Sequence, residues 1–125
     1  GETDEAVAKV VEWVRYRIVF YGSTPAYWPV LEHHDLGDLG RKLNSMTKAG
    51  QWDQLSEEID DDVLSLFTAM GRYDEITDAV TKRFGGAVDM LYASLSTDNI
   101  PNIPRDVLQD IQAIDVAFKG FQRSW

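Results

Sequence analysis

The stretch FYGSTPAYWPVLEHH, residues 20–34, decides how the chain folds, because it ends one helix and starts another within a few positions. Gly22 is a residue type that commonly ends helices. Thr24 followed by Pro25 is typical of a helix start, with threonine as the N-cap and proline in the first turn. Pro29 comes about one turn later, so the second helix is expected to start irregularly or to kink.

The segment that precedes this stretch predicts one long helix. Asp4 or Thr3 is a suitable N-cap, and Gly22 is the expected end. One apolar stripe with the helical period consists of Val7, Val10, Val11, Val14, Ile18 and Tyr21, and a second consists of Trp13, Tyr16 and Phe20. The second half of this helix is therefore apolar on nearly all sides, and we expect it to be covered on two of them.

The segments that follow also have mostly helical patterns. Gly37 and Gly40 are interpreted as loop breakers, and Gly50 is expected to end a helix. Helices are predicted on the apolar residues of 36–46, 52–59, 63–70, 74–84 and 104–118, and Asp60, Asp61 and Asp62 stand at the start of the third of these.

Residues 88–95 form the single good strand candidate, because they are short, apolar and bounded by Gly85-Gly86 and by a polar turn. A lone strand cannot satisfy its backbone groups, so it either pairs across an oligomer or stays irregular. With about six helical segments to one strand, we predict a mainly α fold with at most one or two strands. A chain of 125 residues is expected to form a single domain over residues 1–125.

The charge balance excludes several classes of partner. The chain has 12 basic and 21 acidic residues, and the net charge of −9 argues against a nucleic acid or an anionic membrane as the main partner. No cysteine is present, which excludes disulfides and thiolate chemistry. The start of the chain, residues 1–5, is acidic and lacks the apolar core of a signal peptide, so a cytoplasmic location is expected.

Few residues suggest catalysis or metal binding. His33 and His34 are adjacent, so on a helix they point about 100° apart and do not readily share one metal ion. Glu32 or Asp35 beside a histidine forms a conceivable acid–base pair of a small enzyme, although surface residues at a helix end are the better interpretation. Aromatic residues cluster between Trp13 and Trp28, and they suit either a pocket for a flat ligand or an apolar core.

Residues 20–34 also resemble a stretch of the luciferase-like monooxygenase superfamily of flavin- or deazaflavin-dependent oxidoreductases. That family commonly has Phe-Tyr-x-Ser-Thr-Pro-x-Tyr-x-Pro-Val-Leu at this step. Further similar stretches follow in order at residues 50–53, 59–64, 71–76, 83–85 and 88–91, so the resemblance runs from about Val14 to Leu95. The sequence departs from the family pattern at Asp35, where a glycine is common, and at Arg72 and Tyr73, which replace a cap residue and a proline.

The resemblance implies a fragment of a barrel. The family fold is a TIM barrel, which typically takes about 250 residues, and this chain resembles only its C-terminal third. It is therefore not a complete barrel, and the lone strand at 88–95 would be the last barrel strand. The first residue, Gly1 in place of Met, fits a cut from a longer chain.

The resemblance also implies a cofactor and its neighbours. The full-length family uses FMN or the deazaflavin coenzyme F-420, while this chain alone is expected to bind neither and to be inactive, because the cofactor pocket is incomplete. Catalytic residues stay unknown and no metal is expected. The residues expected nearest the cofactor are Tyr21, Ser23, Thr24, Tyr27 and Trp28, and a second group after the predicted strand is Ser94, Ser96 and Thr97.

Two partners follow from this interpretation. The missing N-terminal barrel portion would cover the exposed apolar faces, or copies of the chain would cover them as a homo-oligomer. The alternative function is a self-associating helical interaction module without catalysis, motivated by the aromatic residues and the unpaired strand.

Overall fold

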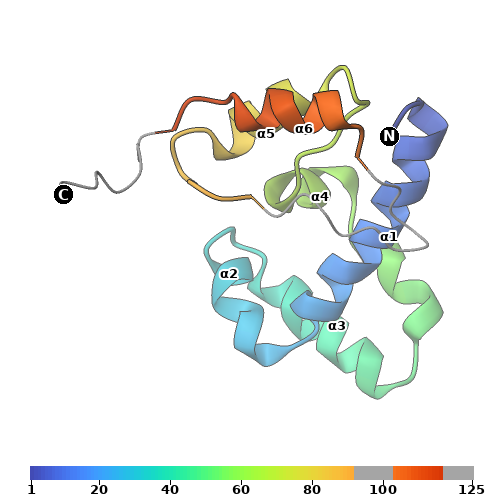
Figure 1. Cartoon of the computed structure of the whole chain (residues 1–125). Helices are drawn as coiled ribbons and strands as arrows, with labels where there is room; N and C mark the ends of the chain where they lie inside the picture. The colour runs from blue at the N-terminus through green and yellow to red at the C-terminus, as the bar shows by residue number, and fades with distance from the viewer. Residues whose placement is uncertain (92–102, 117–125) are drawn as a thin grey trace, which may run out of the picture. The chain divides into compact units, whose positions relative to one another are not determined.

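The computed structural model of the chain describes residues 1–91 and 103–116, and these ranges contain helices and no strand (Figure 1). The prediction of a mainly α fold is therefore confirmed. The elements, in chain order, are α1 (Asp4–Gly22), the 3-10 helix η1 (Pro25–Tyr27), α2 (Trp28–Glu32), α3 (Gly37–Lys48), the 3-10 helix η2 (Trp52–Glu58), α4 (Asp61–Phe67), α5 (Ile76–Phe84) and α6 (Arg105–Gln112).

The chain divides into two compact units. One unit comprises Gly1–Val7 with Ala69–Trp125, and the other comprises Ala8–Thr68. Helix α1 contributes its first residues to the former unit and the remainder to the latter. The prediction of a single domain stays a prediction.

The unit Ala8–Thr68 has an aliphatic core drawn from most of its elements. Its fully buried side chains, each with 0% exposure, are Val19, Leu43, Leu55 and Leu64. Val19 belongs to neither predicted stripe of α1, and its neighbour Ile18, which does, is only partly buried. The helical period did not identify Val19 as a core residue, because the end of α1 is apolar on nearly all sides and the sequence pattern does not show which side is most buried.

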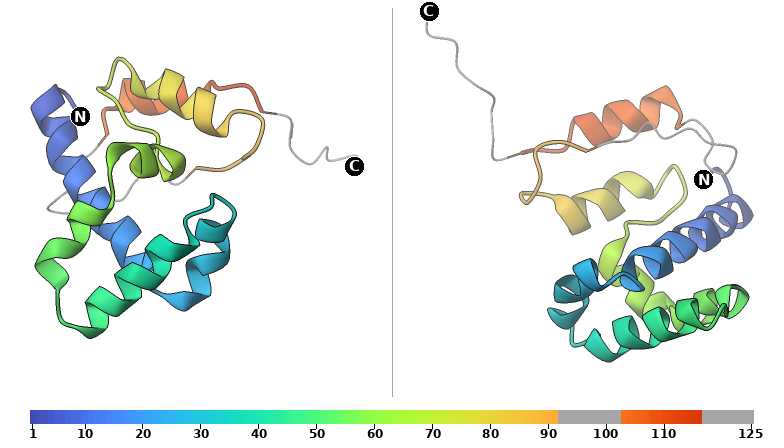
Figure 2. Two further views of the ribbon diagram at one scale, coloured as in Figure 1. Left: turned by 180° about the vertical axis from the view of Figure 1, so that it is seen from behind. Right: turned by 90° about the horizontal axis from the view of Figure 1, so that it is seen from below.

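Helix α3 contradicts the interpretation of Gly37 and Gly40 as loop breakers, because both lie within it. A Cβ atom added to Gly40 would lie 2.8 Å from Cδ1 of Trp28 and 2.9 Å from Cδ1 of Leu31. The missing side chain therefore allows α2 to lie directly against α3, and the two helices run side by side (Figure 2). Tertiary packing here outweighs the low helix propensity of glycine.

Arg15 joins α1 to the start of α4. Its guanidinium donates hydrogen bonds to the carbonyl of Ile59 and, at 2.7 Å, to the carboxylate of Asp61, and its side chain is only 12% exposed. The hydrogen bond to Asp61 raises the pKa of Arg15 above its usual value, so the group stays charged. Asp60 accepts a 2.8 Å hydrogen bond from the Val63 amide, which confirms the predicted acidic start of this helix.

The unit Gly1–Val7 with Ala69–Trp125 contains α5 and α6, which pack together (Figure 2). The helix predicted over 74–84 begins at Ile76, because Glu75 closes a turn by accepting a 3.2 Å hydrogen bond from the amide of Arg72. Arg72 also pairs with the carboxylates of Asp4, Asp74 and Glu75, and these charges raise its pKa, Asp74 most strongly. Helix α6 begins after Pro104 as predicted, and it buries Val107.

The predicted strand is not formed where the structure describes it. Residues 88–91 follow α5 in an irregular conformation, and residues 92–95 lie outside the described ranges. The expectation that this segment either pairs across an oligomer or stays irregular is consistent with the described part.

We predict that Gly40→Ala destabilises the protein by about 2 kcal/mol, because the new methyl group displaces the packed side chains of Trp28 and Leu31. Gly37→Ala in the same helix is the matched control. Its nearest side-chain atoms, at 3.0 Å, belong to the flexible side chains of Arg41 and Glu32, so we expect a change within about 0.5 kcal/mol. Urea unfolding measures both, and equal effects of the two substitutions would contradict the close approach at Gly40.

Candidate functional site

The residues predicted nearest a cofactor all lie where α1 ends and α2 begins, and the structure gives them different tasks. Ser23 is buried, with 7% exposure, and its hydroxyl donates a 2.9 Å hydrogen bond to the carbonyl of Phe20. The Thr24 hydroxyl donates to the same carbonyl at 3.2 Å. Both hydroxyls thus satisfy a carbonyl of the last turn of α1.

Thr24 does occupy the N-cap position of η1, with an extended backbone, as the sequence predicts. Its side chain, however, makes no capping hydrogen bond, because the hydroxyl is turned back toward α1. The expectation of an irregular second helix is confirmed, since the three residues Pro25–Tyr27 form a 3-10 turn before α2 starts at Trp28.

Trp28 holds the two helices together. Its indole nitrogen donates a 3.2 Å hydrogen bond to the carbonyl of Gly22, the last residue of α1. The Arg41 guanidinium lies 5.9 Å from the centroid of the indole ring. The ring of Trp28 also lies against Gly40, so this side chain contacts both α1 and α3.

Tyr21 and Tyr27 are the two predicted site residues that face open space. Their side chains are 40% and 45% exposed, and their rings meet edge to face with centroids 5.0 Å apart. Arg17 donates a 2.9 Å hydrogen bond to the hydroxyl of Tyr21, and its guanidinium lies 5.2 Å from the centroid of that ring. Arg17 therefore restrains Tyr21 by two contacts.

The two tyrosines line an open pocket of about 320 Å³, which we call the tyrosine pocket. Among the described residues, its lining is almost entirely apolar and consists of Ile18, Tyr21, Gly22, Tyr27, Val30, Leu31 and Phe67. The sequence does not predict Phe67 as a site residue, because it reaches the pocket from α4 and no local pattern connects it to the turn. Two other lining residues could have been suspected from the sequence. Val30 lies within the stretch that resembles the family, and Ile18 lies just before it.

The lining suits a flat apolar ring better than acid–base chemistry. Pockets for such ligands combine apolar walls with a few polar groups, which the two tyrosine hydroxyls supply here. The alternative pair of Glu32 with a neighbouring histidine does not line the pocket, and Glu32 instead pairs with Arg41 at 3.4 Å. His34 stacks edge to face on Phe67, with ring centroids 5.4 Å apart.

Two further expectations concern other parts of the chain. Within residues 1–91 and 103–116, no group of three or more histidine, aspartate or glutamate side chains is arranged to hold a metal ion. The second predicted group, Ser94, Ser96 and Thr97, lies outside these ranges. No helix in the described part of the chain is long and apolar enough to cross a membrane.

Comparison with known proteins identifies long relatives of the chain. It is 42% identical over 123 residues to an uncharacterized protein of Mycobacterium bovis and equally to an uncharacterized protein of Mycobacterium tuberculosis. Each alignment covers 98% of this chain and 33% of the relative, so the chain spans about a third of the length of the curated relatives it matches. No family model and no solved structure matches the chain.

We predict that Trp28→Phe destabilises the protein by about 1–2 kcal/mol, because the carbonyl of Gly22 loses its hydrogen-bond donor. Trp52→Phe is the control, since this side chain is 45% exposed, and its effect should stay within about 0.5 kcal/mol. Thermal unfolding followed by far-UV circular dichroism compares the two variants. A Trp28 variant as stable as the control would show that the indole does not hold the turn.

Proposed function

We propose that the chain is the C-terminal segment of a luciferase-like oxidoreductase that uses a flavin or deazaflavin cofactor. The observation that carries this proposal is the tyrosine pocket. The stretch with the most specific family resemblance, residues 20–34, forms the turn that exposes Tyr21 and Tyr27 beside an apolar pocket. A pocket of this kind suits one part of a flat ring system.

The length of the relatives supports the same proposal. Proteins about three times as long as the aligned segment have room for the roughly 250 residues of a TIM barrel. The remaining barrel would then be the intramolecular partner of this segment. It would cover the large apolar side chains that lie exposed on α1 and α2, which are 44–51% accessible at Tyr16, Phe20 and Val30.

The pocket residues fit only part of the proposed cofactor. Apolar walls and tyrosine rings suit a tricyclic ring, but no described lining residue carries a positive charge for the phosphate of FMN or F-420. Such cofactors transfer hydride or activate oxygen when bound in a complete site. On this segment, Tyr21 and Tyr27 would border the ring, and Ser23, Thr24 and Trp28 would hold the turn that presents them. A cytoplasmic location stays a prediction.

We expect that this chain neither binds FMN or F-420 in the micromolar range nor turns over with either, because the described residues of the tyrosine pocket offer no cation for a phosphate and 125 residues are too few for a whole barrel. Fluorescence titration of the chain with each cofactor measures binding. The full-length Mycobacterium tuberculosis relative is the positive arm and should bind one of the two. Tight binding with turnover by this chain alone would overturn its inactivity, whereas a relative that binds neither cofactor would overturn the family assignment.

A self-associating helical module is the second candidate, and the exposed aromatic face of the unit Ala8–Thr68 favours it. Four large apolar side chains of this unit are each 44–51% exposed, namely Tyr16, Phe20, Tyr27 and Val30. Exposed apolar surface of this kind often marks a site of protein–protein contact. A second copy of the chain would cover this face if no barrel does. The net charge of −9 opposes association of two copies, so added salt should strengthen it.

For this candidate, we expect sedimentation velocity over a dilution series to show a dimer or larger species that persists at low micromolar concentration. Val30→Asp should shift that species toward the monomer, because it places a charge in the apolar face. Ala49→Asp, at an exposed position outside this face, is the control and should leave the distribution unchanged. A monomer at low micromolar concentration at both low and high salt would count against self-association.

A further inference from the structure

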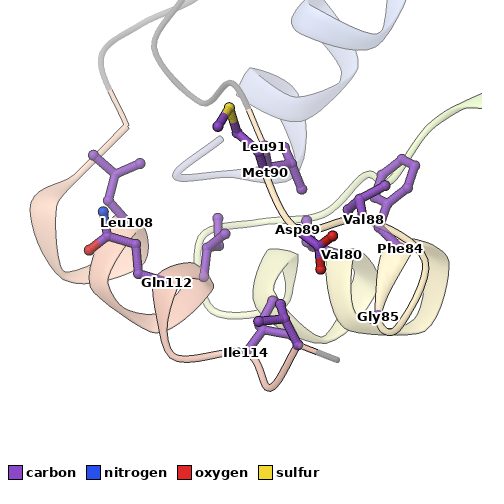
Figure 3. A pocket seen from close by; sticks show the side chains of 12 residues that line it. Val80, Phe84, Gly85, Val88, Asp89, Met90, Leu91, Leu108, Gln112 and Ile114 are labelled. Carbon is purple, nitrogen blue, oxygen red and sulfur yellow. The ribbon is translucent and has the colours of Figure 1, made fainter. Parts of the chain in front are cut away.

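A second pocket lies within the unit that contains α5 and α6, and the proposed function makes no use of it (Figure 3). Its volume is about 270 Å³. Val80 and Phe84 line it from α5, Leu108 and Ile111 line it from α6, and the exposed residues 88–91 border another side. We call it the α5–α6 pocket.

Most of the side chains that line the α5–α6 pocket are aliphatic or aromatic, and one is charged. Asp89 is the single charged side chain among the described residues that line it, and Figure 3 shows it among the apolar side chains. Gln112 adds one neutral amide. The pocket is open to solvent and Asp89 is itself exposed. A carboxylate beside such a pocket favours a cation, which gains an ion pair, over an anion, which meets repulsion.

Asp89 is available for such an ion pair. Within residues 1–91 and 103–116, none of the ion pairs or side-chain hydrogen bonds engages its carboxylate. The guanidinium of Arg83 lies 6.0 Å from the ring centroid of Phe84, but Arg83 does not line the pocket. The net charge of −9 adds a field that favours cations over anions at this site.

We propose that the α5–α6 pocket binds small alkylammonium ions. The hydrocarbon chain lies between α5 and α6, and the ammonium group pairs with the carboxylate of Asp89. The volume of about 270 Å³ is just below the usual range for ligand pockets, which limits the ligand to a short aliphatic amine. This inference does not depend on the proposed oxidoreductase function, since its residues belong to a different part of the chain from the tyrosine pocket.

The test uses ligands of matched length and different charge. The full 125-residue chain, labelled with nitrogen-15, is titrated with hexylammonium, hexan-1-ol and hexanoate at low ionic strength, and amide shifts in α5, α6 and residues 88–91 report binding. We expect affinity to fall in that order, with the amine ahead of the alcohol by about threefold to fivefold, as for a partly exposed ion pair. Each methylene contributes about fourfold in affinity, so butylammonium, which is two methylenes shorter than hexylammonium, should bind about fifteenfold more weakly.

Two variants distinguish an effect of Asp89 on amine affinity from an effect of the protein's net charge. Asp89→Asn should lower the affinity for hexylammonium to that for hexan-1-ol. Asp78→Asn removes the same charge from an exposed position on α5 that does not line the pocket, and it should leave the preference for the amine intact.

Three outcomes would overturn the proposal. One is the absence of amine-induced shifts in α5 and α6 up to the solubility limit. Another is equal affinity for the amine and the alcohol, which would make the pocket merely apolar. The last is an equal loss in the two variants, which would assign the preference to net charge and not to Asp89.

Discussion

The close approach of backbone to side chains at Gly22 and Gly40 is the constraint on which the unit Ala8–Thr68 depends. A Cβ atom on Gly22 would lie 3.2 Å from Leu43, and one on Gly40 would lie 2.8 Å from Trp28. These two glycines let α1, α2 and α3 pack with almost no gap, and Leu43 is consequently fully buried. The indole of Trp28 then reaches the carbonyl of Gly22, which would otherwise be an unpaired helix end.

At the turn between α1 and α2, neighbouring residues of the predicted site have different structural roles. Ser23, Thr24 and Trp28 direct their polar atoms to carbonyls of α1, where they complete the backbone hydrogen bonding. Tyr21 and Tyr27 direct their rings outward to the tyrosine pocket. The first group satisfies the carbonyls at the turn, and the second group lines the tyrosine pocket together with Phe67.

The two pockets differ in the chemistry that they offer. The tyrosine pocket is apolar, open and bordered by phenol groups, with Arg17 outside it on the ring of Tyr21. The α5–α6 pocket carries a carboxylate among aliphatic side chains. The flat ring and the short amine that we propose as ligands therefore belong to different parts of the chain.

The sequence by itself determined the helical class, most helix boundaries and the turn at residues 22–25, because glycine, proline and capping acids act over a few residues and need no distant partner. It also pointed to Tyr21 and Tyr27, through a resemblance in one short stretch. Only the tertiary structure decided that Val19 is the apolar side chain of α1 that is fully buried, that Gly40 is a packing site within a helix, and that Phe67 lines the tyrosine pocket. These features depend on contacts between segments far apart in the chain. The local period of apolar residues does not show which distant side chain packs against a given face of a helix.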